Sequence, residues 1–305
     1  MQAQSTVPQE RKNWSDILAK TVKTGIIKSN LFPMLAGLTL ALYTYQYGIL
    51  EKLPDILFAI VGSILVIGAA GAFNNLYDRD IDAVMERTKN RPTVTGDIQA
   101  GTVMWLAALM AVLGIAILAL TTPLAALLGF IGLFAYVVPY TMWSKRRTIY
   151  NTEIGSISGA MPPLIGWASI YPDVTHPAIL GLFVIMIIWQ MPHFYAIAIR
   201  NQAQYKAANV PMLPVVKGIR RTYIQTNIYL ILLIATSFLL GSLSTGLMLV
   251  ALLLSIGWLG ISMYGYRKMD SQQWAKLLFL YSLVHMTVLY STVIIYSLMG
   301  IIFKL

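Results

Sequence analysis

Long apolar stretches, separated by shorter polar segments, fill most of this chain. Each stretch has about 20 residues, which is enough for a helix to cross a hydrocarbon core of about 30 Å. The pattern therefore predicts an all-α fold, a polytopic membrane protein with nine transmembrane helices. The expected spans are residues 25–46, 54–76, 100–121, 123–141, 153–171, 177–199, 222–242, 244–265 and 274–301.

The polar segments are too short to hold a second folded domain. Residues 1–24 are polar and charged, and we expect a cytoplasmic N-terminal segment there, followed by a single transmembrane domain over residues 25–305. The first apolar stretch is too long for the core of a signal peptide, so it is expected to be retained. The nine spans put the two longest connections, residues 77–99 and 200–221, on the same side of the membrane.

The basic residues lie almost entirely on that side. Of the 22 lysines and arginines, only Lys52 and Lys304 fall in segments expected on the opposite side. By the positive-inside rule, this asymmetry predicts a multi-pass protein of the cell membrane with a cytoplasmic N-terminus and an external C-terminus. The net charge of +10 is then a signal of topology, and a nucleic-acid partner is not expected.

Composition narrows the class of protein further. The chain is 57% hydrophobic and only 11% charged, whereas soluble domains carry about 25% charged residues. It has no cysteine, which excludes disulfides, cysteine-based zinc sites and covalent attachment of a c-type haem. The lipid bilayer is therefore the expected environment of the domain.

A polar motif follows directly after the second apolar stretch. Asn74, Asp78 and Asp82 are spaced four residues apart, so on a helix they lie on one face while Asp80 points away. Carboxylates crowded at the end of a membrane helix repel one another. A hard divalent cation such as Mg²⁺ relieves this repulsion because it prefers oxygen ligands and keeps substrate phosphates in its shell. The three residues are therefore candidate metal ligands and catalytic residues.

Basic side chains follow this motif within a few helical turns, at Arg87, Lys89 and Arg91. Cations beside a carboxylate–metal cluster suit a diphosphate, and we assign these three to diphosphate binding. The alternative is a solvated loop of mixed charge that binds nothing. Against it, four of the twelve acidic residues of the chain fall in this one loop: Asp78, Asp80, Asp82 and Glu86.

Two of the expected spans contain features that a plain membrane helix lacks. Pro162 and Pro163 interrupt the span 153–171, and the carbonyl groups that they free must be buried in protein or face a cavity. In the span 177–199, His193 follows a tryptophan, a glutamine and a proline. A polar side chain at membrane depth is a candidate site residue. His193 is therefore either a substrate contact or a hydrogen-bonded residue of the core.

The polar motif and six stretches of the sequence together resemble the UbiA superfamily of intramembrane prenyltransferases. The resemblance is closer to members that farnesylate haem than to members that prenylate quinone precursors. The stretches occur in the family's order across the second to seventh spans, and they are residues 75–82, 85–96, 140–148, 159–167, 189–194 and 210–216.

The resemblance implies a UbiA-type bundle around a central cavity that opens towards the inner face. It implies that farnesyl diphosphate and haem b are the substrates, and that a farnesyl group is transferred to a haem vinyl group with addition of water, giving haem O. A haem A synthase is considered as a protein partner. The cofactor implied is Mg²⁺, held by the three motif residues.

The resemblance also implies roles for individual residues. Arg87, Arg91 and Lys145 would contact the diphosphate, and we add Lys89 and Arg146 to this group. Aromatic faces stabilise a cation, so the aromatic residues of the family's cavity would surround the farnesyl cation. The residues expected to line the substrate cavity are Tyr140, Trp167, His193 and Tyr195.

One departure from the family pattern lies in the connection 200–221. The family places acidic residues before the tyrosine that matches Tyr205, as a second metal-binding motif, but here those positions hold Ala203 and Gln204. The amide oxygens of Asn201 and Gln204 are the expected neutral replacements in a metal shell. Without the resemblance, the segment is an ordinary cytoplasmic loop.

Three other functions stay open at this point. A different UbiA-type enzyme would prenylate a quinone precursor. A catalytically weakened paralogue would bind haem or an isoprenoid without turnover, which the missing acidic residues favour. A transporter would need machinery for alternating access, usually built from internal repeats, and the sequence shows no convincing repeat.

Overall fold

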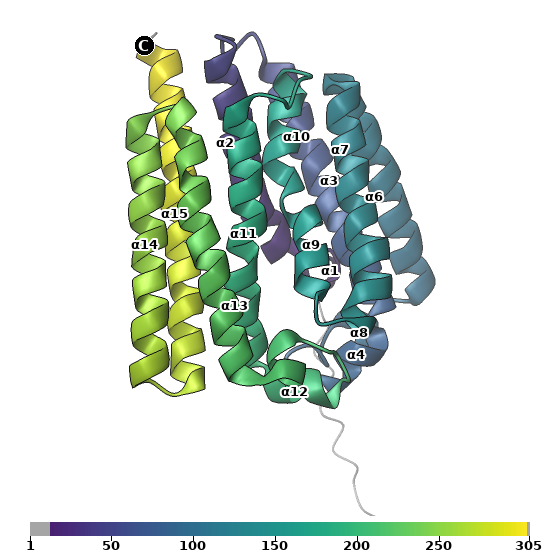
Figure 1. Cartoon of the computed structure of the whole chain (residues 1–305). Coiled ribbons are helices and arrows are strands. Elements are labelled where there is room, and N and C mark those ends of the chain that lie inside the picture. The colour runs from purple at the N-terminus through teal and green to yellow at the C-terminus, as the bar shows by residue number, and fades with distance from the viewer. Residues whose placement is uncertain (1–12, 304–305) are drawn as a thin grey trace, which may run out of the picture.

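Eight stretches of helix in the described chain, residues 13–303, are long and apolar enough to cross a membrane. The structure is a computed structural model, and these residues form no strand (Figure 1). The predicted all-α membrane bundle is therefore confirmed. The eight stretches are α2 (Thr24–Thr44), α3 (Leu53–Tyr77), α6 (Ala100–Thr121), Pro123–Arg147, α11 (Pro177–Arg200), Leu213–Ser242, α14 (Thr245–Lys268) and α15 (Ser271–Phe303).

Two of these stretches are composite. The stretch Pro123–Arg147 consists of α7 (Pro123–Ala135), a π-helix η1 (Tyr136–Ser144) and one turn, α8 (Lys145–Arg147). The other composite stretch begins at residue 213, earlier than the expected 222, because Gly218 joins two helical pieces in a left-handed conformation with φ of 73°. It consists of α13 (Leu213–Ser237) and a final 3₁₀ turn, η2 (Phe238–Ser242).

The ninth expected span, residues 153–171, is divided into two short helices, α9 (Asn151–Gly159) and α10 (Met161–Ile170). The interruption falls just before Pro162 and Pro163, whose missing N–H groups are tolerated in the first turn of α10. Gln190 of α11 fills the break, because its Nε2 donates to the Ser156 carbonyl at 3.0 Å. The interruption that the two prolines predict is confirmed by the division into α9 and α10.

Close packing between α2 and α10 fixes the centre of the bundle. A Cβ atom on Gly166 would lie 2.0 Å from the Met34 carbonyl oxygen, and one on Gly37 would lie 2.0 Å from the Pro163 carbonyl oxygen. Small residues allow backbones to approach this closely. The middle of α2 is therefore held firmly against α10.

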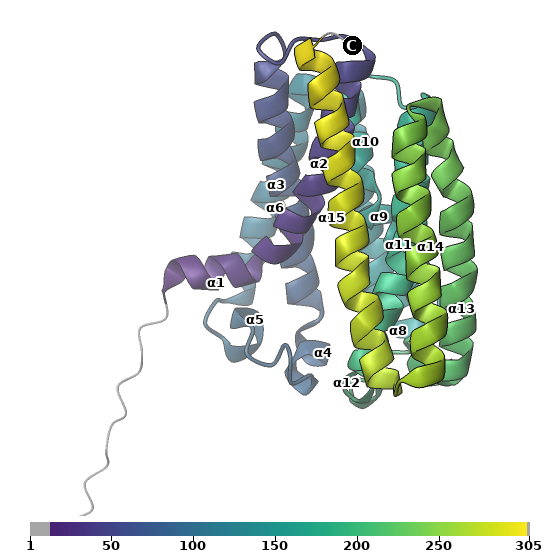
Figure 2. The same cartoon turned by 90° about the vertical axis from the view of Figure 1, so that its left-hand side faces the viewer.

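The short polar helices gather at one end of the bundle (Figures 1 and 2). As the sequence predicts, the connections 77–99 and 200–221 meet there, while α15 ends at the opposite end (Figure 1). Residues 1–12 of the expected N-terminal segment, and Lys304, lie outside the described residues. The short helices are α1 (Trp14–Thr21), α4 (Arg79–Val84), α5 (Pro92–Thr95), α8 and α12 (Gln202–Ala207).

Candidate active site

The three residues of the polar motif share one face at the junction of α3 and α4. Helix α3 ends at Tyr77, and the Asp82 N–H donates to the Asp78 carbonyl at 2.8 Å, so the chain continues helically across the junction. Asn74, Asp78 and Asp82 are at most 3% exposed. The side chain of Asp80, by contrast, is 64% exposed. The arrangement is the one that the four-residue spacing predicts.

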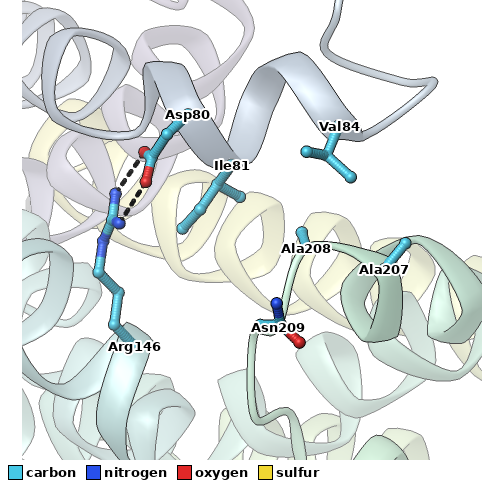
Figure 3. A pocket seen from close by; sticks show the side chains of 7 residues that line it. All are labelled: Asp80, Ile81, Val84, Arg146, Ala207, Ala208 and Asn209. Atoms are coloured by element: carbon cyan, nitrogen blue, oxygen red, sulfur yellow. Dashed lines mark hydrogen bonds and ion pairs between the residues drawn. The ribbon is translucent and has the colours of Figure 1, made fainter.

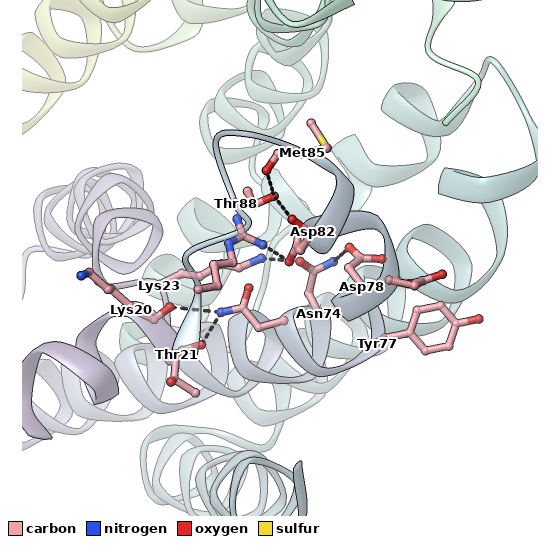
Figure 4. Close-up of polar contacts among 12 residues, drawn as sticks. Lys20, Thr21, Lys23, Asn74, Tyr77, Asp78, Asp82, Met85 and Thr88 are labelled. Carbon is pink, nitrogen blue, oxygen red and sulfur yellow. Dashed lines mark hydrogen bonds and ion pairs between the residues drawn. The ribbon is translucent and has the colours of Figure 1, made fainter. Parts of the chain in front are cut away.

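Each of the three motif residues contacts a different cation, and Figure 4 draws Lys23 beside Asn74. Lys23 Nζ donates to Asn74 Oδ1, Lys145 Nζ donates to Asp78 Oδ2, and Arg91 Nη1 donates to Asp82 Oδ2. The three cations come from three segments, which are the N-cap of α2, the start of α8 and the loop after α4. Two carboxylates therefore lie among three basic groups, an excess of positive charge that suits a polyanionic ligand.

The amide of Asn74 links the stripe to η1. Its Nδ2 donates to Asp78 Oδ2 at 2.8 Å and to Thr141 Oγ1 at 2.9 Å. Asp78 Oδ1, in contrast, is fully buried and accepts no hydrogen bond. The Nη2 of Arg146 lies 3.5 Å from it. A buried carboxylate oxygen without a hydrogen bond is costly unless a cation approaches it.

Sequence reasoning did not identify Lys23. Asn75 donates to the Lys20 and Thr21 carbonyls at 3.1 and 2.8 Å, which ties the end of α1 to α3 and brings the next residues over the stripe. Lys23 itself has a left-handed backbone, with φ of 57°. Burial lowers the pKa of its amine well below the usual value, and repulsion from Arg91 and Lys145 acts in the same direction. The available signal was its position as the last basic residue before the first span.

The loop after α4 folds back so that Arg91 reaches Asp82. Thr88 Oγ1 donates to the Asp82 carbonyl at 3.0 Å, and the Arg91 N–H donates to the Thr88 carbonyl at 3.0 Å. Lys89, in contrast, lies on the outside, where its amine pairs with Glu86 at 2.5 Å and both side chains are largely exposed. The structure thus brings Arg91 to the stripe and leaves Lys89 away from it.

The π-helix η1 supplies the other side of the site. Wider turns of this kind are rare and often mark functional positions, and Pro139, which has no N–H to donate, lies inside this one. Thr141 is fully buried beside Asn74, and the half-buried Tyr136 and Tyr140 lie with their rings 5.4 Å apart. The expected role of Tyr140 near the motif is therefore compatible with its position. Tyr136 was not foreseen.

Arg146 pairs with Asp80, which points away from the stripe (Figure 3). Its guanidinium donates to both oxygens of Asp80, at 2.6 and 2.7 Å, and these hydrogen bonds lower the pKa of Asp80 to about 2. The same group donates to the Tyr77 carbonyl at 3.1 Å. A cavity of about 370 Å³ opens beside this pair, between α4 and α12, and is lined by Asp80, Ile81, Val84, Arg146, Ala207, Ala208 and Asn209.

The connection 200–221 contacts the polar loop through an amide. Gln204 Oε1 accepts the Arg87 backbone N–H at 3.2 Å, and the exposed Arg87 has no ion pair among the described residues. Asn201 Nδ2 donates to the Ile197 carbonyl at 2.8 Å. The Gln204 oxygen, which we expected near a metal, is thus engaged in joining the two loops.

Two of the expected cavity residues make hydrogen bonds to residues outside the stripe. Trp167 is fully buried in α10, a helix that lies towards the opposite end of the bundle (Figure 1), and its Nε1 donates to the Asp173 carbonyl at 2.6 Å. Tyr195 is fully buried, and its hydroxyl donates to Glu153 Oε1 at 2.5 Å. Neither contact supports the predicted place in a substrate cavity, because both rings are enclosed by packing. His193 is half-buried between α11 and α15.

The residues present fit Mg²⁺. The stripe offers two carboxylates and one amide oxygen, all hard ligands, and Asp78 Oδ1 has an unused acceptor site. Among residues 13–303 there is no group of three histidine, cysteine, aspartate or glutamate side chains placed to hold a metal. This is expected, because the third ligand is an asparagine. With so few ligands, substrate phosphates and water would complete the shell.

Known proteins with similar sequences belong to the same family that the sequence motifs resemble. Residues 30–284 match the UbiA prenyltransferase family. The chain is 73% identical over 297 residues to "Protoheme IX farnesyltransferase 1" of Bacillus cytotoxicus, covering 97% of each chain.

Solved structures with a similar fold are more distant in sequence. A digeranylgeranylglyceryl phosphate synthase has a TM-score of 0.75 at 14% identity, over 93% of this chain and 98% of that one. A UbiA homologue from Archaeoglobus fulgidus, solved with DMAPP and Mg²⁺, has a TM-score of 0.66 at 13% identity, over 91% and 98%. At this identity the two structures establish the fold alone.

Proposed function

Because this chain belongs to the UbiA prenyltransferase family, we propose that it is a protoheme IX farnesyltransferase. It would transfer a farnesyl group from farnesyl diphosphate to a vinyl group of haem b, with addition of water, and so form haem O. The observation that carries the proposal is the stripe of Asn74, Asp78 and Asp82, with a cation on each residue. The high identity to a protoheme IX farnesyltransferase supports the choice of substrates.

The reaction breaks the bond between farnesyl C1 and the diphosphate oxygen. A bond then forms between C1 and the vinyl carbon, and water adds its oxygen to the neighbouring carbon and releases one proton. Lys23, Arg91 and Lys145 would bind the diphosphate as it leaves, so that their charges oppose the negative charge developing on it. Arg146 would hold α4 in place through Asp80 rather than contact the substrate.

Mg²⁺ bound by Asn74, Asp78 and Asp82 would neutralise charge on the leaving diphosphate. Thr141 would keep the Asn74 amide turned so that its oxygen faces the ligand, since the Nδ2 group donates to Thr141. Tyr136 and Tyr140 would cover the allylic carbon with aromatic faces, which stabilise a cation and exclude water until the vinyl carbon has reacted. The Gln204 contact to Arg87 would hold the two loops together.

The site would face the cytoplasm. The excess of basic residues at the end of the bundle that carries α4 and α12 supports this orientation under the positive-inside rule. With this orientation, we propose a multi-pass protein of the cell membrane with an external C-terminus. The expectation of a haem A synthase as partner has no support from the fold or the relatives, and it is not part of the proposal.

The proposal is tested by mass spectrometry of the haems made by purified protein from farnesyl diphosphate and haem b. Wild-type protein with Mg²⁺ should form haem O, and a chelator should abolish this activity until Mg²⁺ is restored. Asp78→Asn and Asp82→Asn should each lower the rate by about 10²-fold or more, as loss of electrostatic stabilisation typically does.

A matched control lies in the same loop. Glu86→Gln removes an exposed carboxylate that pairs with Lys89, so its rate should stay near that of the wild type. If wild-type protein yields no haem O but prenylates an aromatic acid, a different enzyme of the family is present. If it binds haem and makes no product at any Mg²⁺ concentration, the weakened paralogue is the correct interpretation.

A further inference from the structure

The hydrogen bonds around His193 define which of its nitrogens carries a proton. Ser282 Oγ donates its single proton to the Phe279 carbonyl at 2.5 Å. The same Oγ lies 2.7 Å from His193 Nδ1, and with its proton already used it can only accept there. Nδ1 is therefore the protonated nitrogen. Nε2 then carries the free lone pair, and it has no hydrogen-bond partner among residues 13–303.

The imidazole is also fixed in orientation by the rings around it. Trp189 stacks on it with centroids 4.7 Å apart at 19°, and Phe279 lies 5.2 Å away at 31°. Phe194 meets it edge-on at 5.2 Å. The half-buried ring thus has one nitrogen locked by a hydrogen bond and the other left available. In metal sites the nitrogen that does not bind the metal is held in this way, which sets the tautomer of the ligand.

His193 lies at a depth that suits the proposed acceptor. Ala198 of the same helix packs in one cluster with Ile81 and Met85 of the polar loop. His193 is five residues before Ala198, which places it about 7–8 Å deeper in the membrane along α11. Towards the polar end, Arg200 lies two turns after His193, and its guanidinium stands over the Phe279 ring at 5.2 Å.

We infer that His193 Nε2 binds the haem b iron as an axial ligand, with the haem propionates directed towards Arg200. This inference rests on the proposed function, because it assigns a place to that reaction's acceptor. A neutral imidazole is a common haem ligand, and a guanidinium pairs well with carboxylates. The haem would stand with its charged edge at the polar end and its vinyl-bearing edge in the apolar interior.

The second histidine in the membrane interior provides a matched control. His285 is 1% exposed, and its Nε2 lies 3.2 Å from Ser255 Oγ. Its Nδ1 is fully buried, so neither nitrogen is accessible to a ligand the size of haem. His285→Gln keeps a group that can bond to Ser255, and it should leave haem binding unchanged.

The test is a titration of purified full-length protein with ferric haem b, followed by the Soret band and electron paramagnetic resonance. Wild-type protein should show a histidine-ligated spectrum, and His285→Gln should show the same one. His193→Ala should lose this spectrum, and added imidazole should restore it. His193→Met, which keeps most of the volume, should change the spectrum to that of a thioether ligand. Arg200→Gln should weaken binding and keep the spectrum.

An unchanged spectrum in both His193 variants would overturn the inference. Haem O formation, measured on the same preparations, separates this failure from failure of the proposed function. Wild-type protein that makes haem O while its spectrum ignores His193 would exclude the iron ligand and keep the enzyme. A spectrum that depends on His193, without any haem O from farnesyl diphosphate, would keep the ligand and exclude the enzyme.

Discussion

Lys23 donates to Asn74 from a position 51 residues earlier in the chain. Lys23→Met removes one of three nitrogen donors around the diphosphate, so kcat/KM for farnesyl diphosphate should fall by about 10²-fold or more, as is typical for the loss of one stabilising donor. Lys28, exposed one turn further along α2, is the matched control, and Lys28→Met should change little. Steady-state kinetics of both variants decide between a substrate contact and a merely structural lysine.

Tyr195 is expected to act through stability rather than chemistry. Its hydroxyl donates to Glu153, as do Gln225 at 3.2 Å and Tyr229 at 3.3 Å. Tyr195→Phe leaves the carboxyl group with one donor fewer, a loss of about 1.5–3 kcal/mol for a hydrogen bond to a charged group. The melting temperature should therefore fall while the rate of haem O formation holds. Tyr150→Phe, at an exposed tyrosine, is the control and should change neither quantity. A Tyr195→Phe protein that makes haem O more slowly at an unchanged melting temperature would contradict a purely stabilising role for Tyr195.

Single residues also set the limit of sequence reasoning at the site. Spacing predicted the shared face of Asn74, Asp78 and Asp82, because helical geometry links residues four apart. It could not predict Lys23, since no periodicity connects two segments that meet only after α1 and α3 have packed. Trp167 and Tyr195 are cavity candidates through the resemblance and through the chemistry of aromatic rings, and neither argument tells which residues a ring contacts in the folded bundle.

At the level of helices, the contact of α2 with α10 should be the least tolerant of added volume. Gly166→Ala places a methyl group 2.0 Å from the Met34 carbonyl oxygen, where only movement of the backbone relieves the overlap. Overpacking of this kind typically costs about 1–3 kcal/mol. The melting temperature of the Gly166→Ala protein in detergent should therefore be lower than that of the wild type.

The control for this substitution is a glycine without close neighbours. Gly260 lies in α14, and a Cβ atom there would meet nothing within 4 Å. Gly260→Ala should be neutral or slightly stabilising, because alanine favours helix over glycine. Equal melting temperatures for the two variants would show that α2 and α10 have room to separate.

Helix positions followed from the apolar pattern, because long hydrophobic runs are required to cross a bilayer. The division of the span 153–171 followed from Pro162 and Pro163. The π-helix η1 could not be predicted from the sequence, because Pro139 lies in an apolar run and nothing nearby indicates that the helical turns widen around it. The pattern also does not predict that α13 begins at Leu213. The polar residues around Gly218 are typical of a loop, whereas in the structure Gly218 forms a bend within the helix.

For the whole molecule, the charge asymmetry makes a prediction about orientation. A reporter inserted at Asp270, between α14 and α15, should be cytoplasmic, and one inserted at Asp173, after α10, should be external. Accessibility to a membrane-impermeant label in intact cells measures both. The reverse result would place the stripe of Asn74, Asp78 and Asp82 on the outer face, away from the soluble diphosphate supply of the cell.

The cluster of cations and carboxylates has a consequence for how the protein is made. Lys23, Asn74, Asp78, Asp82, Arg91 and Lys145 all precede residue 150, whereas His193, Arg200 and the Gln204 contact come later. During synthesis, the first half of the chain therefore contains all the residues proposed to bind the diphosphate before the residues proposed to bind haem have been made. Two fragments divided in the connection between α10 and α11, expressed together, should assemble in the membrane and regain activity, because the division leaves each half of the chemistry on one fragment.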